Sequence, residues 1–431
     1  MKASFWKEQG PVAAMLALIV LERIVVMCML GTDYNIANDD IGYIGSGIRF
    51  LSEGIIGIYS DEPSAMIMPG MTWLLAAMTW LFGQGEAYWL AVKLLWIAMG
   101  TCTAWVTYVG VRMFAPRWCG LLALVAFLVP NVAWMDNIIL TETPYFLCFT
   151  LTVVLTLMMG RSNSKGVFAG YCVAYMAGVL LRPTLVVMPV FSLAYLFLLG
   201  VDRKLLLRRM ITGIVILLLF MLPWSARNYA LFDHFVPLTY GTGNPMLLGS
   251  YQGFGYPEDS PELDAAVEAE FRETYAEYLD EDGNVKDSVM TQFLTLQKDG
   301  IKADLRMEQW WDTHPLQMLV SYLGVKPGII VFKSFYWEEL FGVPELAIDL
   351  LRGVNFLLCC LCVVLALKRK QLRMELGFLT VVYWLYVFMI GLTFAFSRYG
   401  ETLMSIRYIL GAVGIWMLLD EIKQRKNGVP S

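Results

Sequence analysis

Two adjacent carboxylates and three separated arginines are the residues best suited to chemistry in this sequence. Asp39 and Asp40 follow the first long apolar run. Such a pair can act as a general base or bind a cation, so it also suggests a site for Mg²⁺ or Mn²⁺. Arginine binds phosphate through a bidentate fork, which makes Arg182, Arg227 and Arg398 candidates for an anionic group.

Each of these features has a simpler alternative. The acidic pair fits a solvated loop, and the arginines fit interfacial anchors beside apolar runs. Glu142 is the first residue of an apolar run. A carboxylate there either complements the helix dipole or belongs to a functional site. No zinc-like spacing of Cys and His is present, and the sequence holds only two histidines.

The elements that position these residues are membrane helices. Of 431 residues, 58% are apolar and 16% are charged. Soluble chains are roughly 45–50% apolar and about 25% charged, which argues against an ordinary soluble enzyme, a disordered chain, a fibre or a disulfide-stapled domain. Apolar runs of about 20 residues recur, each long enough to cross a bilayer. The fold class is therefore an all-α polytopic membrane protein.

Ten apolar runs are predicted to cross the membrane, with both termini cytoplasmic. The run 66–82 is ambiguous. All six basic clusters can lie on the cytoplasmic side of consistently alternating spans only if this run does not cross. The predicted spans are 11–30, 86–111, 118–134, 142–160, 166–181, 184–201, 210–224, 347–367, 374–396 and 402–420.

The charges are divided between the two sides. Residues 225–346 carry 20 acidic and 8 basic residues, whereas the rest of the chain carries 17 acidic and 24 basic ones. The positive-inside rule places this segment and the first loop, 31–65, on the outer face. The chain then divides into a transmembrane module (1–224), a large extracytoplasmic loop (225–346), and C-terminal helices with a cytoplasmic tail (347–431). The acidic excess argues against nucleic-acid binding.

The large loop is predicted to be mainly helical. Residues 261–281 and 287–311 are rich in helix formers, and the turn residues 282–284 separate them. The aromatic, amphipathic stretch 327–341 is expected to form an interfacial helix. The topology gathers the acidic pair, Glu142 and the three arginines at the outer face, an arrangement suited to transfer from a phosphate-linked donor.

The order of these motifs resembles that of the GT-C superfamily of integral-membrane glycosyltransferases. The similarity is to family 39, which includes protein O-mannosyltransferases and bacterial lipid A aminoarabinose transferases. Residues 39–43 resemble the family's Asp-acidic-x-x-Tyr pattern, and residues 223–228 resemble its Pro-Trp-x-x-Arg-Asn exit. Further matches are LTETPYFL, LLRPTLVVMP and SRYGETL.

The resemblance implies a GT-C-like bundle of about 10–11 spans with outer juxtamembrane helices. It also implies an inverting transfer from a polyprenyl-phosphate sugar to a lipid, glycan or protein hydroxyl, within the membrane lipids of a bacterial cytoplasmic membrane. Asp39, with Asp40, would supply the catalytic carboxylates, and the three arginines would bind the donor phosphate. Predicted substrate-binding residues are Tyr43, Glu142, Asn228 and Asn244. No nucleotide cofactor is expected.

The sequence departs from its relatives at two positions. Met68 stands where some relatives have a Lys or His before the proline, and Gly42 stands where the lipid A enzyme has a basic residue. Two other functions stay open, namely a transporter or flippase of a lipid-linked glycan and a membrane scaffold. Neither the sugar nor the acceptor follows from the sequence.

Overall fold

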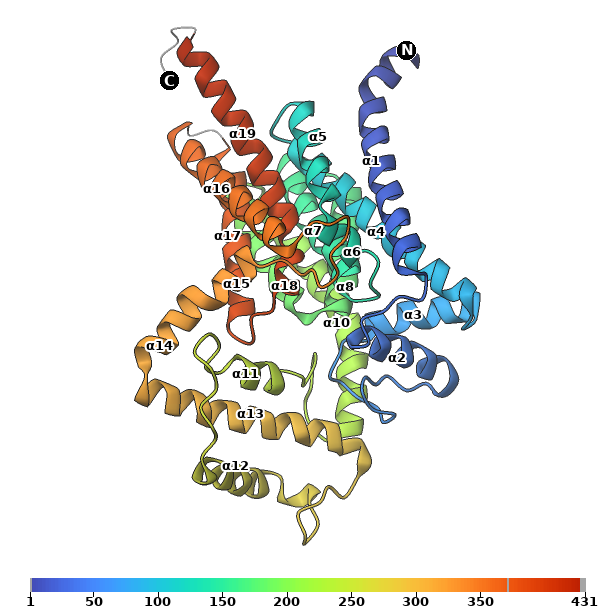
Figure 1. Ribbon diagram of the computed structural model, residues 1–431, viewed down its shortest axis with the longest axis vertical. Coiled ribbons are helices and arrows are strands. Elements are labelled where there is room, and N and C mark those ends of the chain that lie inside the picture. Colours follow the sequence, from blue (N-terminus) through green and yellow to red (C-terminus); the bar gives the residue numbers. More distant parts are fainter. Residues whose placement is uncertain (1, 370–371, 427–431) are drawn as a thin grey trace.

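The computed structural model describes residues 2–369 and 372–426, so the last residues of the predicted cytoplasmic tail lie outside it. Within these ranges the regular secondary structure is helical apart from one isolated β-bridge, Leu279–Val285. Figure 1 shows an upright helix bundle above a smaller group of helices. The predicted fold class is confirmed.

Most of the bundle consists of apolar helices whose bounds agree with the predicted spans. The long ones are α1 (Lys2–Leu30), α4 (Glu86–Arg112), α7 (Glu142–Arg161), α8 (Lys165–Leu181), α10 (Arg203–Phe232), α16 (Glu345–Arg369), α17 (Arg373–Gly391) and α19 (Met404–Lys426). Two further passes are built from short pieces: α5 (Arg117–Val125) with η1 (Ala126–Leu128) and α6 (Pro130–Met135), then η2 (Pro183–Val187) with α9 (Met188–Leu198).

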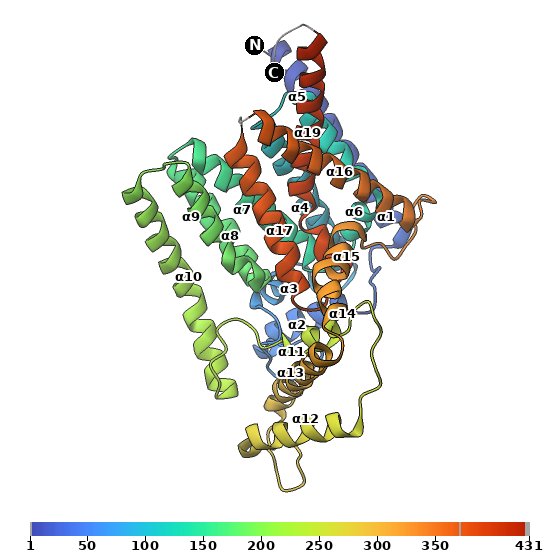
Figure 2. The same ribbon diagram turned by 90° about the vertical axis from the view of Figure 1, so that its left-hand side faces the viewer.

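Both described ends of the chain lie at one end of the bundle, here called the terminal end (Figure 1). The opposite end, the loop end, carries α2 (Asp39–Glu53) and α3 (Pro69–Phe82). Figure 2 shows the bundle helices joined by short connections at the terminal end. The 14 residues of α3 rise about 21 Å, less than the roughly 30 Å of a bilayer core. Helices α8 and α9 are also shorter than a bilayer crossing, so the topology of 66–82 stays a prediction.

The large loop forms a helical domain below the bundle in Figure 1, here called the outer domain after its predicted side of the membrane. It contains α11 (Gly243–Gly249), α12 (Pro261–Thr274), η3 (Ala276–Tyr278) and α13 (Ser288–Thr313). The two predicted loop helices are thus present, and Gly283, at φ +85°, makes the turn between them. Trp310 on α13 is fully buried and stacks on Tyr251, with 4.6 Å between ring centroids.

The segment that leads from the outer domain back to the bundle differs from the prediction of one helix over 327–341. Helix forms earlier, as α14 (Pro315–Val320), the π-helical η4 (Ser321–Val325) and α15 (Lys326–Phe332). It ends at residue 332 because carboxylates take the next backbone N–H groups. Asp349 accepts from Ser334 N at 2.8 Å, and Glu401 accepts from Phe335 N at 2.8 Å.

Seven segments within the described ranges are long and apolar enough to cross a membrane. Six of them were predicted as spans. The seventh, Pro315–Phe332, runs obliquely between the outer domain and the bundle in Figure 1. Four predicted spans are not among the seven. The spans 118–134, 166–181 and 184–201 correspond to the shorter apolar helices Arg117–Leu128, Lys165–Leu181 and Pro183–Leu198. The span ending at 420 corresponds to α19, which is 23 residues long.

We predict that the loop end faces the outside of the cell. Asn163→Cys, at an exposed position between α7 and α8, and Glu281→Cys, at an exposed position of the outer domain, test this sidedness. A membrane-impermeant maleimide should label Glu281→Cys in intact cells and Asn163→Cys only after permeabilisation. The parent chain, with its own eight cysteines, gives the background. The reverse labelling pattern would contradict the orientation.

Candidate active site

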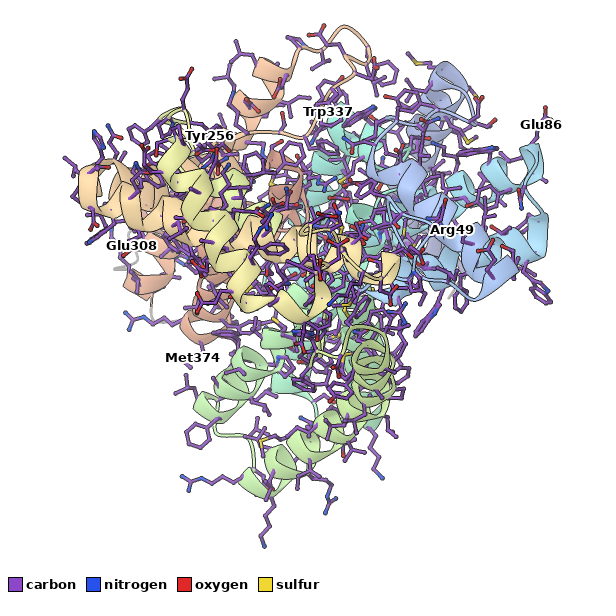
Figure 3. All side chains as sticks on the ribbon, turned by 90° about the horizontal axis from the view of Figure 1, so that it is seen from below. Arg49, Glu86, Tyr256, Glu308, Trp337 and Met374 are labelled. Carbon is purple, nitrogen blue, oxygen red and sulfur yellow. The ribbon has the colours of Figure 1, made fainter. Side chains whose placement is uncertain are left out.

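A pocket of about 320 Å³ opens at the loop end of the bundle, where segments distant in sequence meet. Figure 3 views this end from below, with Arg49 of α2 to one side and Glu308 of α13 to the other. Tyr43, Arg182 and Arg398 all line the pocket. Three of the residues predicted from the sequence therefore share one cavity.

Four charged side chains form a continuous chain beside this pocket. Arg398, on α18 (Ser397–Glu401), places Nη1 2.6 Å from Asp39 Oδ2 and Nε 3.4 Å from Glu142 Oε1. Arg182 pairs with the same oxygen of Glu142. Arg182 Nε also donates to Thr141 Oγ1 at 2.9 Å. The order Asp39–Arg398–Glu142–Arg182 alternates negative and positive charges.

Aromatic rings fix the planes of the two guanidinium groups. Tyr399 lies between them, 5.2 Å from Arg182 and 5.3 Å from Arg398. Tyr145 flanks Arg182 at 5.5 Å and Phe396 flanks Arg398 at 5.3 Å. Such cation–π contacts are favourable in partly desolvated surroundings. The arginines are therefore held in place rather than free to swing.

Both arginines keep their charge in this setting. Burial alone would lower the pKa of Arg398, but Glu142, Tyr399 and Asp39 together raise it above its ordinary value. Burial and the neighbouring Asp39 raise the pKa of Tyr43 well above its usual range. Tyr43 thus remains a neutral hydroxyl that can donate a hydrogen bond in the pocket.

Asp40 has a different environment from Asp39. Its side chain is fully buried and accepts three backbone N–H groups, from Ile36 at 2.6 Å and from Asn38 and Ile41 at 3.0 Å each. These bonds fold the segment that leads into α2. Asp40 therefore stabilises the backbone at the start of α2, which positions Asp39.

Arg227 and Asn228 lie outside the pocket lining. Arg227 donates to the carbonyl oxygens of Ser64 at 2.9 Å and Ile56 at 3.4 Å, and its guanidinium lies over Trp224. Asn228 is fully buried and donates to Val236 O at 2.9 Å. The Pro-Trp-x-x-Arg-Asn motif thus fastens the α2–α3 loop (residues 54–68) to α10.

Asn244 likewise belongs to the supporting structure. Its side-chain amide donates to Asp299 Oδ2 at 3.1 Å and ties α11 to α13. Of the predicted site residues, Asp39, Tyr43, Glu142, Arg182 and Arg398 gather around the pocket. The other four, Asp40, Arg227, Asn228 and Asn244, hold the segments that surround it.

Three residues at the site were not predicted to be functional. Tyr399 follows Arg398 directly, so its nearness to the arginine was readable from the sequence. Tyr59, in the α2–α3 loop, donates a hydrogen bond to Asp39 Oδ1. No sequence pattern predicts this contact. Met68 is buried and lines the pocket with a thioether.

A divalent cation at the acidic pair stays a prediction. Within the described ranges no group of three or more His, Cys, Asp or Glu side chains is placed to hold a metal ion. Asp39 contacts Tyr59 and Arg398, whereas Asp40 binds backbone N–H groups.

Comparison with solved structures identifies the architecture. The oligosaccharyltransferase of Archaeoglobus fulgidus in its apo form aligns over 98% of this chain and 52% of its own, with 12% identity and a TM-score of 0.56. The same enzyme tethered to an acceptor peptide aligns over 98% and 51%, with 11% identity and a TM-score of 0.54. ArnT of Cupriavidus metallidurans bound to undecaprenyl phosphate aligns over 97% and 79%, with 15% identity and a TM-score of 0.43.

The chain is similar in fold to this archaeal oligosaccharyltransferase, and it spans about half the length of that enzyme. No protein-family model matches the sequence. No curated protein matches it either.

We predict that Asp40→Asn mainly reduces stability. An amide accepts the three backbone N–H groups less strongly than a carboxylate, and losing charge-assisted bonds costs about 1.5–3 kcal/mol. Thermal unfolding in detergent should show a lower midpoint. The control Asp61→Asn removes a carboxylate whose side chain is 94% exposed and should shift the midpoint little. Equal midpoints for the two variants would contradict the structural role of Asp40.

Proposed function

We propose that this protein is a membrane glycosyltransferase that moves a sugar from a polyprenyl-phosphate donor to a hydroxyl group. The observation that carries the proposal is the contact of Asp39 with Arg398 beside a pocket that also contains Arg182. A base and two fixed cations thus meet at the loop end of a GT-C bundle. The likeness to an oligosaccharyltransferase supports glycosyl transfer as the reaction.

The two arginines are suited to a phosphate leaving group. Negative charge grows on the donor phosphate as its bond to the sugar breaks, so cations fixed nearby stabilise the transition state more than the ground state. Arg182 and Arg398 are the cationic side chains among the described residues that line the pocket. Their aromatic neighbours fix the guanidinium planes before the donor arrives.

The pocket also has the apolar surface that a lipid-linked donor requires. Met66, Leu181, Met389 and Ile390 line it together with the arginines. The pocket lies where the bundle meets the outer domain. A donor whose phosphate binds at the polar side of the pocket can therefore place its prenyl chain among the bundle helices. A freely soluble donor would not need this position.

The proposed reaction accounts for each bond that forms or breaks and for the transferred proton. The acceptor oxygen attacks the anomeric carbon while its proton passes to Asp39. The bond between that carbon and the phosphate oxygen breaks, and the electron pair leaves with polyprenyl phosphate. Because attack and departure occur on opposite faces, the anomeric configuration inverts. The acceptor is a lipid, glycan or protein at the outer face of the cytoplasmic membrane of a bacterium.

Purified protein in nanodiscs tests this function. The donors are undecaprenyl-phosphate-linked glucose, galactose, mannose and arabinose, and the acceptors are envelope membranes from cells lacking the protein. Mass spectrometry should detect one glycosylated product and free undecaprenyl phosphate. Asp39→Asn should lower the rate about 10²–10⁴-fold, as expected for loss of a general base, whereas Asp61→Asn should retain it.

Two results would contradict the proposal. Wild-type rates in Asp39→Asn would remove Asp39 from the mechanism. The flippase alternative requires the donor lipid to cross liposome membranes without sugar transfer. A comparison of envelope glycans with and without the protein would identify the sugar and the acceptor.

A further inference from the structure

Both oxygens of the candidate base are already occupied. Asp39 Oδ2 faces Arg398, and Oδ1 accepts the hydroxyl proton of Tyr59. A carboxylate that removes a proton from an acceptor needs one oxygen in contact with the acceptor hydroxyl. The contact between Arg398 and Oδ2 is part of the series Asp39–Arg398–Glu142–Arg182 and is kept. An acceptor therefore has to displace the Tyr59 hydroxyl from Oδ1.

Tyr59 has the position of a movable cover. Its residue is 56% exposed, although its hydroxyl reaches Asp39. Its backbone is left-handed, with φ +61°, a conformation that an aromatic L-residue adopts only when its surroundings impose it. Tyr59 is therefore held over the base by its loop and does not rest there by its own preference.

The missing side chain of Gly42 allows this loop to approach α2. A Cβ atom at Gly42 would lie 2.7 Å from Ile58 Cγ1 and 3.3 Å from Tyr59 Cε1. Gly42 thus lies at the place where the loop closes over the start of α2.

The outer domain holds the same loop. Gln292 on α13 donates to Ile58 O at 2.8 Å, and Ser288 donates to Glu62 Oε1 at 2.6 Å. The Gln292 bond is one residue away from Tyr59. A change in α13 that breaks it would release the backbone that places the tyrosine, which links the outer domain to the base.

We propose that the Tyr59 hydroxyl occupies the acceptor's place at Asp39 and keeps water from the base until an acceptor displaces it. The inference rests on the proposed function and adds a means of suppressing donor hydrolysis. In the suppressed reaction a water proton would pass to Asp39, the water oxygen would join the anomeric carbon, and polyprenyl phosphate would leave with the electron pair.

The test is Tyr59→Phe in the full-length protein, which removes the hydroxyl and keeps the ring. Release of undecaprenyl phosphate from the donor panel, measured without acceptor, should rise about tenfold, a factor typical of one hydrogen bond to a charged group. The control Tyr229→Phe, at a 55% exposed tyrosine on α10, should leave hydrolysis unchanged. In the double variant Tyr59→Phe/Asp39→Asn the extra hydrolysis should disappear.

Gln292→Ala should raise acceptor-free hydrolysis in the same direction, because it frees the loop from α13. Its control is Thr295→Ala, at an exposed position on the same helix whose hydroxyl donates to Thr291 O. An increase for Gln292→Ala alone would support the link between the outer domain and the base. Equal rates in both variants would overturn it.

Hydrogen exchange of the α2–α3 loop gives a readout that needs no turnover. Exchange should accelerate in Tyr59→Phe and in Asp39→Asn but not in Tyr229→Phe. Equal loss of transfer and hydrolysis in Tyr59→Phe would make Tyr59 a positioning residue and overturn its role as a cover. Unchanged hydrolysis would also overturn that role. Accelerated exchange without donor release in any variant would instead refute the proposed function.

Discussion

The arrangement of the site depends on one buried carboxylate. Glu142 is 1% exposed, and a single oxygen of its side chain faces both Arg182 and Arg398. Without it, two guanidinium groups would share a partly desolvated space and repel each other. Through these contacts the first turn of α7 joins the end of α8 to α18. Arg398 then extends the connection to Asp39 and so to α2.

The short helix α18 is positioned from its opposite side. Glu401 pairs with the buried Arg352, accepts from Asn131 Nδ2 at 3.1 Å and accepts from Phe335 N at 2.8 Å. A five-residue helix has little stability of its own. These contacts to α16, α6 and the segment after α15 fix its orientation and hence that of Arg398. The site thus depends on buried polar contacts outside the pocket.

Hydropathy and charge predicted six of the spans, the loop helices and the grouping of Asp39, Glu142, Arg182 and Arg398 at one end of the bundle, because these properties repeat along the chain. The roles of Asp40 and Arg227 were not predictable, since both bind backbone groups whose need for partners appears only after folding. The end of α15 at residue 332 was not predictable for the same reason, since carboxylates bind the backbone N–H groups that follow it. Tyr59 lies in a loop without periodicity, so its contact with Asp39 left no pattern in the sequence.

The four charges of the chain sum to zero before any substrate is present. An arriving phosphate adds a negative charge at the side of the pocket that Arg182 and Arg398 line. A guanidinium group carries five N–H donors, so each arginine can bind the phosphate while it keeps its carboxylate contact. Turning either arginine away from Glu142, which is 1% exposed, would weaken the compensation of a buried charge. The two carboxylates therefore hold the guanidinium groups in place for the donor, which leaves Oδ1 of Asp39 as the oxygen available to an acceptor.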